Sequence, residues 1–222
     1  LQHGIDPKCI DGIFITHEHN DHTSGLRVFA SRYNTPVFAA KACIDAMYAK
    51  DIINEKVHIE KMDYRMELGG VEIKAFSQSH DSADCVGYRL ELPNGKSVAV
   101  CTDTGYVTDN AKEICSGVDL IFAESNHETS MVETGPYPYY LKQRILGTKG
   151  HLSNFACGEF IKELAQSGTT RFVLSHLSRE NNMPHIARQN AIAALDEIGL
   201  CEERDFRLYV SSPESTDKGI AL

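Results

Sequence analysis

The stretch Thr16-His17-Glu18-His19-Asn20-Asp21-His22 decides both the expected fold and the expected chemistry of this chain. It follows directly on the apolar run Gly12-Ile13-Phe14-Ile15, which predicts a buried strand that ends where the polar residues begin. A turn at the end of such a strand can direct the side chains of His17, His19, Asp21 and His22 towards two neighbouring ions. Imidazole and carboxylate together suit Zn²⁺, Mn²⁺ or Fe ions. The stretch therefore predicts a metal site, and the alternative is an incidental His-rich loop.

The composition is that of a globular protein, with 42% hydrophobic and 24% charged residues in a chain of 222. This length suits one sizeable α/β domain or two small ones, and we expect a single hydrolase domain over residues 1–222. No apolar run approaches the roughly 18 residues that span a bilayer, and no signal-peptide pattern opens the chain. The first residue is Leu1 rather than Met, so a targeting segment upstream stays open, and residues 1–5 resemble the end of a helix.

The cysteines and the net charge bear on location and substrate. Seven cysteines occur singly, without a C-x-x-C pair, which favours reduced thiols and a cytoplasmic location. The net charge of −9 argues against a broad basic surface for nucleic acid. However, metal-binding acids lower the formal charge while their ions restore it locally, and a basic stretch runs from Lys142 to Lys149. Charge alone leaves the substrate open.

Apolar runs and helical patterns alternate along the chain, and the tight hairpin signal Pro93-Asn94-Gly95-Lys96 breaks a purely parallel pattern. The sequence therefore predicts a mixed-sheet α/β fold. The expected strands are 13–16, 36–39, part of 55–67, 71–76, 86–92, 97–101, 119–123, 171–174 and 206–210, the last followed by a polar tail. The expected helices are 23–33, 41–50, 108–114, 153–166 and 184–198, and the aromatic segment 135–140 reads as a turn or loop.

Four later groups of polar residues each follow directly on an expected strand. They are His80, Asp103, the segment Glu124-Ser125-Asn126-His127, and His176. Strand ends in α/β folds are where ligands and catalytic groups gather. A single His in a loop is more often a surface residue, but five such groups at strand ends favour one common site.

The order His17-x-His19-x-Asp21-His22, then His80, Asp103 and His176, resembles the metallo-β-lactamase fold superfamily. More narrowly, five segments resemble its YycJ (WalJ) subfamily, which groups with tRNase Z and the β-CASP nucleases. These segments are His80-Asp81-Ser82-Ala83-Asp84, Thr102-Asp103-Thr104-Gly105-Tyr106, Glu124-Ser125-Asn126-His127, Gly150-His151-Leu152-Ser153-Asn154 and Leu174-Ser175-His176-Leu177-Ser178. The resemblance covers most of the chain.

The resemblance implies an αββα sandwich of two mixed sheets flanked by helices, with a site for two divalent ions (Zn²⁺ or Mn²⁺, with Fe possible) at one sheet edge. It implies that one ion is held by His17, His19 and His80, and the other by Asp21, His22 and His176, with Asp103 as the bridge. Members of the family normally begin with a β-hairpin and a Ser/Gly-rich loop that this sequence does not contain. Either the chain is a fragment of a longer protein, or the sandwich lacks that hairpin and has an exposed sheet edge.

The ligand set alone does not separate phosphoryl from acyl chemistry. His151 favours phosphate, because it lies at the start of a predicted helix where backbone N–H groups are free to bind an anion. Similarity to tRNase Z implies that His151 contacts the phosphate and acts as general acid, while Asp21 orients or deprotonates the attacking water. The alternative for His151 is a helix-capping or surface residue.

The remaining candidates concern the substrate. We expect Glu124 and His127 to support the ligands or line the cleft, and Ser153, Ser178, Arg179 and Asn181 to contact phosphate. Lys142, Arg144 and Lys149 form either a strip that binds nucleic-acid backbone or a solvated charged face, and binding is slightly favoured. The side chains of Tyr137, Tyr139 and Tyr140 either stack on unpaired bases or pack internally. His3, His58 and His185 read as surface residues. The leading hypothesis is a metal-dependent phosphodiesterase on nucleic acid, most simply a DNA exonuclease of unknown oligomeric state. The alternatives are a thioester hydrolase of glyoxalase II type and a non-catalytic, metal-stabilised regulatory protein.

Overall fold

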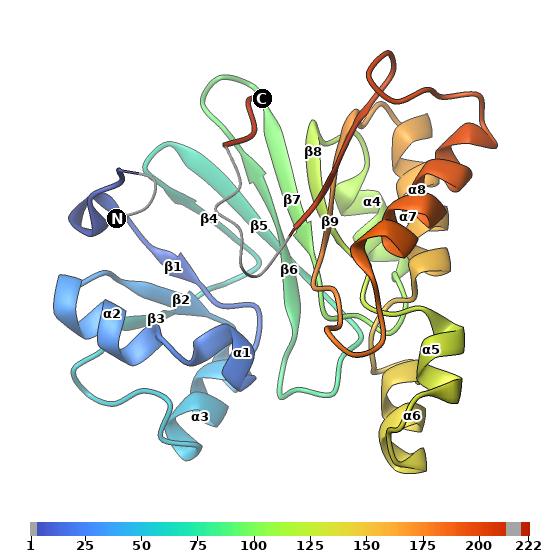
Figure 1. Ribbon diagram of the computed structural model, residues 1–222. Helices are drawn as coiled ribbons and strands as arrows, with labels where there is room; N and C mark the ends of the chain where they lie inside the picture. Colours follow the sequence, from blue (N-terminus) through green and yellow to red (C-terminus); the bar gives the residue numbers. More distant parts are fainter. Residues whose placement is uncertain (1–3, 212–218) are drawn as a thin grey trace.

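Two β-sheets face one another in the computed structural model, which describes residues 4–211 and 219–222. The smaller sheet has the order β1 (Ile13–Phe14), β2 (Val37–Ala39) and β3 (Ile59–Lys61). The larger has the order β10 (Arg207–Val210), β9 (Arg171–Ser175), β8 (Leu120–Glu124), β7 (Ser97–Cys101), β6 (Val86–Glu91), β5 (Val71–Ser77) and β4 (Arg65–Leu68). Figure 1 shows helices on the outer side of each sheet, so the layers follow the order helix, sheet, sheet, helix.

The larger sheet is mixed, as expected, with β4 to β7 antiparallel and β7 to β10 parallel. The smaller sheet departs from that expectation, since its described strands are all parallel. The reason is that helices connect them: α1 (Asn20–Thr23) and α2 (Leu26–Tyr33) lie between β1 and β2, and α3 (Lys41–Ala49) lies between β2 and β3.

Three hydrophobic clusters hold these layers together. The first packs α4 (Asp109–Cys115), α7 (Asn154–Gln166) and α8 (Pro184–Asp196) on the larger sheet through residues such as Ile121 and Phe160. The second packs α2 and α3 on the smaller sheet. The third lies between the sheets, where the rings of Phe14 and Phe38 stack with centroids 5.0 Å apart. Each buried ring or aliphatic side chain stabilises the fold by roughly 1.5–3 kcal/mol.

Most predicted elements are found within one or two residues, and two differences concern the site. The helix expected over 23–33 is divided into α1 and α2, because the backbone turns at Gly25 and α1 begins earlier, inside the His-rich stretch. The loop expected over 135–140 contains the start of a helix. The chain there forms α5 (Thr129–Thr134) and α6 (Tyr139–Leu146), and the Gly and Pro residues that suggested a loop occupy the link between them.

Some expectations fall on parts of the chain outside the description. The helix end expected over residues 1–5, including His3, lies largely before the first described residue, and most of the polar tail lies at 212–218. The cysteines are free thiols, five of them buried. Along the described residues, no helix combines the length and apolar character that crossing a membrane requires.

The topology brings the ends of several strands to one edge. Because β5 and β7 are both antiparallel to β6, and β7, β8 and β9 are parallel, these four strands end at the same edge of the larger sheet. The end of β1 is tied to this edge, since Val86 N–H donates to Thr16 O at 3.0 Å and the Tyr88 hydroxyl donates to Ile15 O at 2.6 Å. The loops after five strands therefore meet there.

Candidate metal centre

The seven predicted ligands lie together at this edge. Ligand atoms of His17, His19 and His80 lie within 4.8 Å of one another, and so do those of Asp21, His22 and His176. His17, His22 and Asp103 form a third such group, which links the first two. The grouping coincides with the two ion sites and the bridge that the family resemblance implies. Their assignment as ligands stays a prediction, which the following contacts support.

The His-rich stretch is shaped by the end of β1 and the start of α1. His19 is the N-cap residue of α1, so the first helical turn presents His22 back towards His17, with ring centroids 4.3 Å apart. Thr16 Oγ1 lies 3.1 Å from His17 Nδ1 and 3.3 Å from His22 Nδ1. Both rings therefore have their Nε2 atoms available, and His17 Nε2 is buried without a hydrogen-bond partner.

Asp103 occupies the middle of the site. Its side chain is fully buried, and neither carboxylate oxygen has a hydrogen-bond partner. The Nε2 atoms of His22 and His176 lie 3.3 and 3.4 Å from it, and that of His80 lies 3.9 Å away. The carboxylate oxygens face these imidazoles without completing a hydrogen bond, so they are free to bind cations. Together with His17 Nε2, this arrangement fits a bridging position between two cations.

The backbone at two of the predicted ligands is strained. Asp103 has φ 62° and His176 has φ 56°, the left-handed region that residues other than glycine rarely adopt. Such conformations persist only where the surroundings enforce them, and they gather at functional sites. Gly105, two residues after Asp103, lets the backbone of Thr148 approach so closely that a Cβ there would clash with it.

The electrostatics divide the imidazoles into neutral and charged. Burial lowers the pKa of His17 to about 3 and also lowers the pKa of His80, so both are neutral and able to bind a metal at pH 7. Burial also acts to lower the pKa of His176, but hydrogen bonds to Asp21 and Glu124 outweigh it and raise that pKa to about 11. A cation at His176 would have to displace this proton, so metal binding would release it.

The two aspartates are held as anions. Burial acts to raise the pKa of the Asp103 carboxyl, but the histidines around it, His22 foremost, hold that pKa well below its usual range. The hydrogen bond with His176 likewise lowers the pKa of Asp21. The Asp21 side chain is 66% exposed, on the solvent side of the site.

Glu124 supports two histidines at once. It is fully buried, and its Oε1 accepts hydrogen bonds from Nδ1 of His151 and Nδ1 of His176, each at 2.8 Å. Its Oε2 accepts from the backbone N–H groups of Thr104 and Leu152 at 2.9 and 3.1 Å. These bonds orient each ring so that its Nε2 points into the site. The contact is the one expected of a carboxylate behind a ligand histidine.

His151 lies inside the site rather than at a helix cap. Its ring centroid is 5.0 Å from that of His80 and 5.3 Å from that of His176. The cap of α7 is supplied instead by Ser153, whose Oγ accepts from Ala156 N–H at 3.2 Å. The helix-cap alternative for His151 is therefore excluded, and its imidazole is placed beside the predicted ions.

The other predicted substrate residues are less open to solvent than expected. His127 is buried with an unpartnered Nδ1, and its carbonyl accepts from Asn154 N–H at 2.9 Å. Ser178 Oγ accepts from Asn181 N–H at 3.1 Å, and Asn181 is itself buried. Arg179 is exposed. Substrate contact by His127, Ser153, Ser178, Arg179 and Asn181 stays a prediction.

Sequence reasoning missed the residues that tie the site loops together. Buried Glu18, between the two histidines of the motif, accepts from Ala83 N–H at 3.1 Å and from Lys50 Nζ at 3.1 Å. Asn126 Nδ2 donates to His176 O at 2.8 Å. Glu18 lies between two predicted ligands and Asn126 lies in a polar segment predicted to belong to the site, but their hydrogen-bond partners are distant in sequence and could not be predicted.

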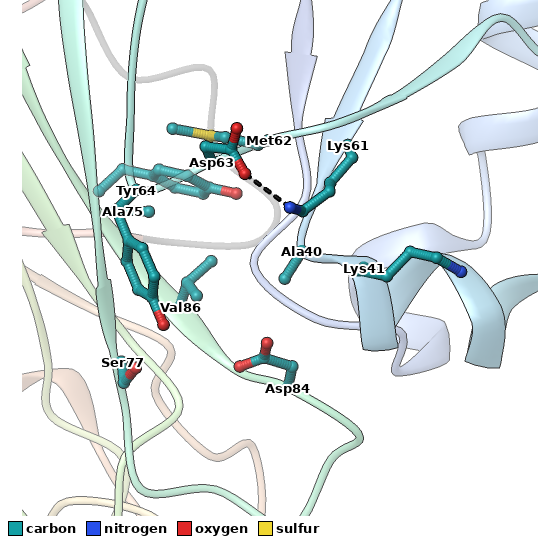
Figure 2. A pocket seen from close by; sticks show the side chains of 11 residues that line it. Ala40, Lys41, Lys61, Met62, Asp63, Tyr64, Ala75, Ser77, Asp84 and Val86 are labelled. Carbon is teal, nitrogen blue, oxygen red and sulfur yellow. Dashed lines mark ion pairs between the residues drawn. The ribbon is translucent and has the colours of Figure 1, made fainter.

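A pocket lies between β3 and the β5–β6 pair (Figure 2). Figure 2 shows Lys61 and Asp63 pointing towards each other, and their Nζ and Oδ1 atoms lie 2.7 Å apart. Its lining residues are Ala40, Lys41, Lys61, Met62, Asp63, Tyr64, Ala75, Ser77, Asp84, Val86 and Tyr88. These residues do not include the predicted ligands, so the pocket is distinct from the metal centre.

Comparison with known proteins bears on this geometry. Residues 2–177 match the family described as beta-lactamase superfamily domain. The chain belongs to that family. Its relatives include the exodeoxyribonuclease WalJ of Streptococcus pneumoniae, 34% identical over 213 residues that cover 94% of this chain and 79% of the relative. The exodeoxyribonuclease YycJ of Bacillus anthracis is 33% identical over 211 residues, covering 94% and 80%.

Solved structures of this superfamily share the fold. The metallo-beta-lactamase fold protein YhfI of Bacillus subtilis superposes with a TM-score of 0.68 at 16% identity, over 94% of this chain and 77% of that one. The short form of human tRNase Z gives a TM-score of 0.59 at 17% identity, over 79% and 75%. The predicted αββα sandwich and the predicted family are thereby confirmed. Family membership and the clustered His and Asp side chains together imply divalent metal ions.

Proposed function

We propose that this protein is a metal-dependent phosphodiesterase that degrades DNA from an end. The observation that carries this proposal is the placement of His151 among the predicted ligands, with Nδ1 held by Glu124 at 2.8 Å. That position suits a proton donor beside a leaving oxygen, which a thioester hydrolase would not need. The names of the relatives, exodeoxyribonucleases similar over 94% of this chain, support DNA as the substrate.

We assign the predicted ligands to two divalent ions, Zn²⁺ or Mn²⁺ with Fe as a further candidate. His17, His19 and His80 would hold one ion, and Asp21, His22 and His176 the other, with Asp103 between them. When bound, such a pair stabilises both the attacking oxygen and the charge that develops on the phosphoryl group. The unpartnered oxygens of Asp103 are the feature of the chain that best fits this role.

The residues around the ions move the protons. Asp21 is an exposed carboxylate with a lowered pKa, so it accepts a hydrogen bond from the attacking water and orients it. His151 points Nε2 into the site because Nδ1 donates to Glu124, so Nε2 is the atom that protonates the leaving oxygen. The free cysteines agree with a reducing, cytoplasmic location for a single hydrolase domain acting on DNA.

The test is digestion of end-labelled DNA and RNA by protein of measured metal content. We expect progressive shortening of DNA from one end with Mn²⁺ or Zn²⁺, abolished by Asp103→Ala. His151→Ala should lower the rate by roughly 10²- to 10⁴-fold, the usual contribution of a general acid. Intact DNA at every metal tested would overturn the proposal. Thioester turnover that survives His151→Ala would instead indicate acyl chemistry.

A further inference from the structure

Helix α6 is unusual in having no buried residue along its length. Figure 1 shows it beside α5, at the lower right of the molecule. Its first two residues, Tyr139 and Tyr140, are 76% and 74% exposed. Both side chains bury only a small part of their apolar surface, so core packing does not account for them. The packing alternative for these tyrosines is thus excluded.

The other end of α6 is fixed against the metal centre. The Arg144 guanidinium forms two hydrogen bonds with the carboxylate of Asp81, the residue after His80, one of them 3.1 Å long. The carbonyl of Ile145 accepts from His151 N–H at 3.1 Å. Ser79 Oγ donates to Thr148 O at 2.8 Å. The helix therefore extends outward from the loops that carry two of the proposed functional histidines.

Helical spacing places only one of the two tyrosines on the face of α6 that carries Arg144. Tyr140 and Arg144 are four residues apart, so they share a helix face and lie about 6 Å apart along the axis. Since Arg144 reaches Asp81 at the edge of the site, Tyr140 lies one turn further out on the same side. Tyr139 is rotated about 100° away, and its hydroxyl accepts from Gln143 Nε2 at 2.8 Å.

The charged and aromatic side chains of α6 indicate which kind of ligand binds the face of Tyr140 and Arg144. Lys142, Arg144 and Lys149 lie on or next to α6, although the whole chain carries a net charge of −9. A guanidinium has five N–H donors, so Arg144 keeps donors for a phosphate while it binds Asp81. Aromatic rings beside cationic groups are the combination that binds single-stranded nucleic acid, because bases stack on rings while phosphates pair with charges.

We propose that the face of α6 formed by Tyr140 and Arg144 binds an unpaired end of a DNA strand. Tyr140 stacks on a base, and Arg144 binds the phosphate next to the one that is cleaved. This inference rests on the proposed function and adds to it that the strand reaches the metal centre unpaired.

The test compares Tyr140→Ala with the matched control Tyr139→Ala, in the metal-loaded full chain. The substrates are an end-labelled oligothymidylate and bis(p-nitrophenyl) phosphate, a small diester too short to reach α6. We expect Tyr140→Ala to raise KM for the oligonucleotide about tenfold, the loss of one stacked base, with kcat nearly unchanged. Tyr140→Phe should restore the KM. Tyr139→Ala should behave as the wild type, and all variants should hydrolyse the small diester equally.

An unchanged KM in Tyr140→Ala, or an equal loss in Tyr139→Ala, would overturn the inference. So would a wild type that elutes as a dimer and becomes a monomer on Tyr140→Ala, because a second copy would then cover the face. A different result would contradict the proposed function. If the wild type hydrolyses the small diester but leaves all DNA intact, the assignment of DNA as the substrate is wrong. If the wild type degrades DNA and Tyr140→Ala degrades it equally well, only the role of α6 is wrong.

Discussion

At the residue scale, the site combines two unusual features in Asp103, a left-handed backbone and a buried carboxylate without hydrogen bonds. His176 repeats the first of these. The sequence could place both residues at strand ends, because apolar runs precede them. It could not reveal the backbone conformation, which depends on how β7 and β9 end against neighbouring loops. The left-handed backbone at both residues indicates a site in which stability is given up for function.

Asp103→Asn should affect both stability and function. Asparagine tolerates the left-handed region, but it loses the attraction to the histidines that holds the Asp103 pKa low, so the metal-free variant should be less stable at pH 7 than the metal-free wild type. DNA hydrolysis should fall below detection, because a neutral amide is a poor bridge between cations. Urea unfolding in EDTA measures the first effect and the digestion assay the second. A metal-free variant as stable as the wild type in EDTA would contradict this account of Asp103.

Glu124→Gln tests the carboxylate shared by His151 and His176. An amide can keep the volume but cannot accept from both rings and both backbone N–H groups as the carboxylate does. We expect metal affinity to fall by roughly 10- to 100-fold, the usual effect of removing the group that orients a ligand histidine. Competition with a chromogenic chelator measures it. Unchanged affinity would show that Glu124 serves the fold alone.

At the scale of elements, apolar runs and their ends were enough to predict the strands that carry the site. The helix expected over 108–114 is found as α4, and Thr108 caps it, since its Oγ1 accepts from Ala111 N–H at 3.1 Å. The sequence was least informative at α5 and α6, because Gly135, Pro136 and Pro138 interrupt any helical pattern. Those residues form the link between two short helices whose positions depend on tertiary contacts such as Arg144 with Asp81.

Two N-cap residues allow a matched comparison. Ser153 caps α7 two residues after His151, and Thr108, which is not among the predicted site residues, caps α4. Ser153→Ala and Thr108→Ala should each lower the free energy of unfolding by about 1 kcal/mol. If Ser153 also contacts phosphate, as the sequence predicts, its variant alone should raise KM for DNA. An equal KM for DNA in the two variants would show that Ser153 only caps α7.

At the scale of the whole molecule, the predicted ligands come from both sheets. His17 to His22 follow the smaller sheet, whereas His80, Asp103 and His176 follow strands of the larger one. The sequence predicted these residues, and the family resemblance predicted how they are grouped. What neither supplied is the network of Glu18, Asn126 and Arg144 that holds the loops in place, since its partners are distant in sequence.

Metal removal should therefore loosen the contact between the layers. Ions that bind only the folded chain stabilise it by about 2.7 kcal/mol at a concentration 100 times Kd. We expect EDTA to lower Tm by several degrees and added Zn²⁺ or Mn²⁺ to restore it, as measured by scanning calorimetry. Asp103→Ala is the control, and its Tm should respond much less to either reagent. A wild type indifferent to EDTA would show that the layers are held without metal.

The dispersal of the ligands along the chain also has a consequence during synthesis. The His-rich stretch is made early, but its last partner is residue 176 of the 222, and β9 must pair with β8 before His176 is in place. At 5–20 residues per second, this interval lasts on the order of ten seconds. During that time a ribosome-bound chain has the predicted ligands of the His-rich stretch but lacks His176. If these residues hold the metal, the centre is completed only after β9 has formed, and we expect a chain that ends before His176 to bind metal weakly.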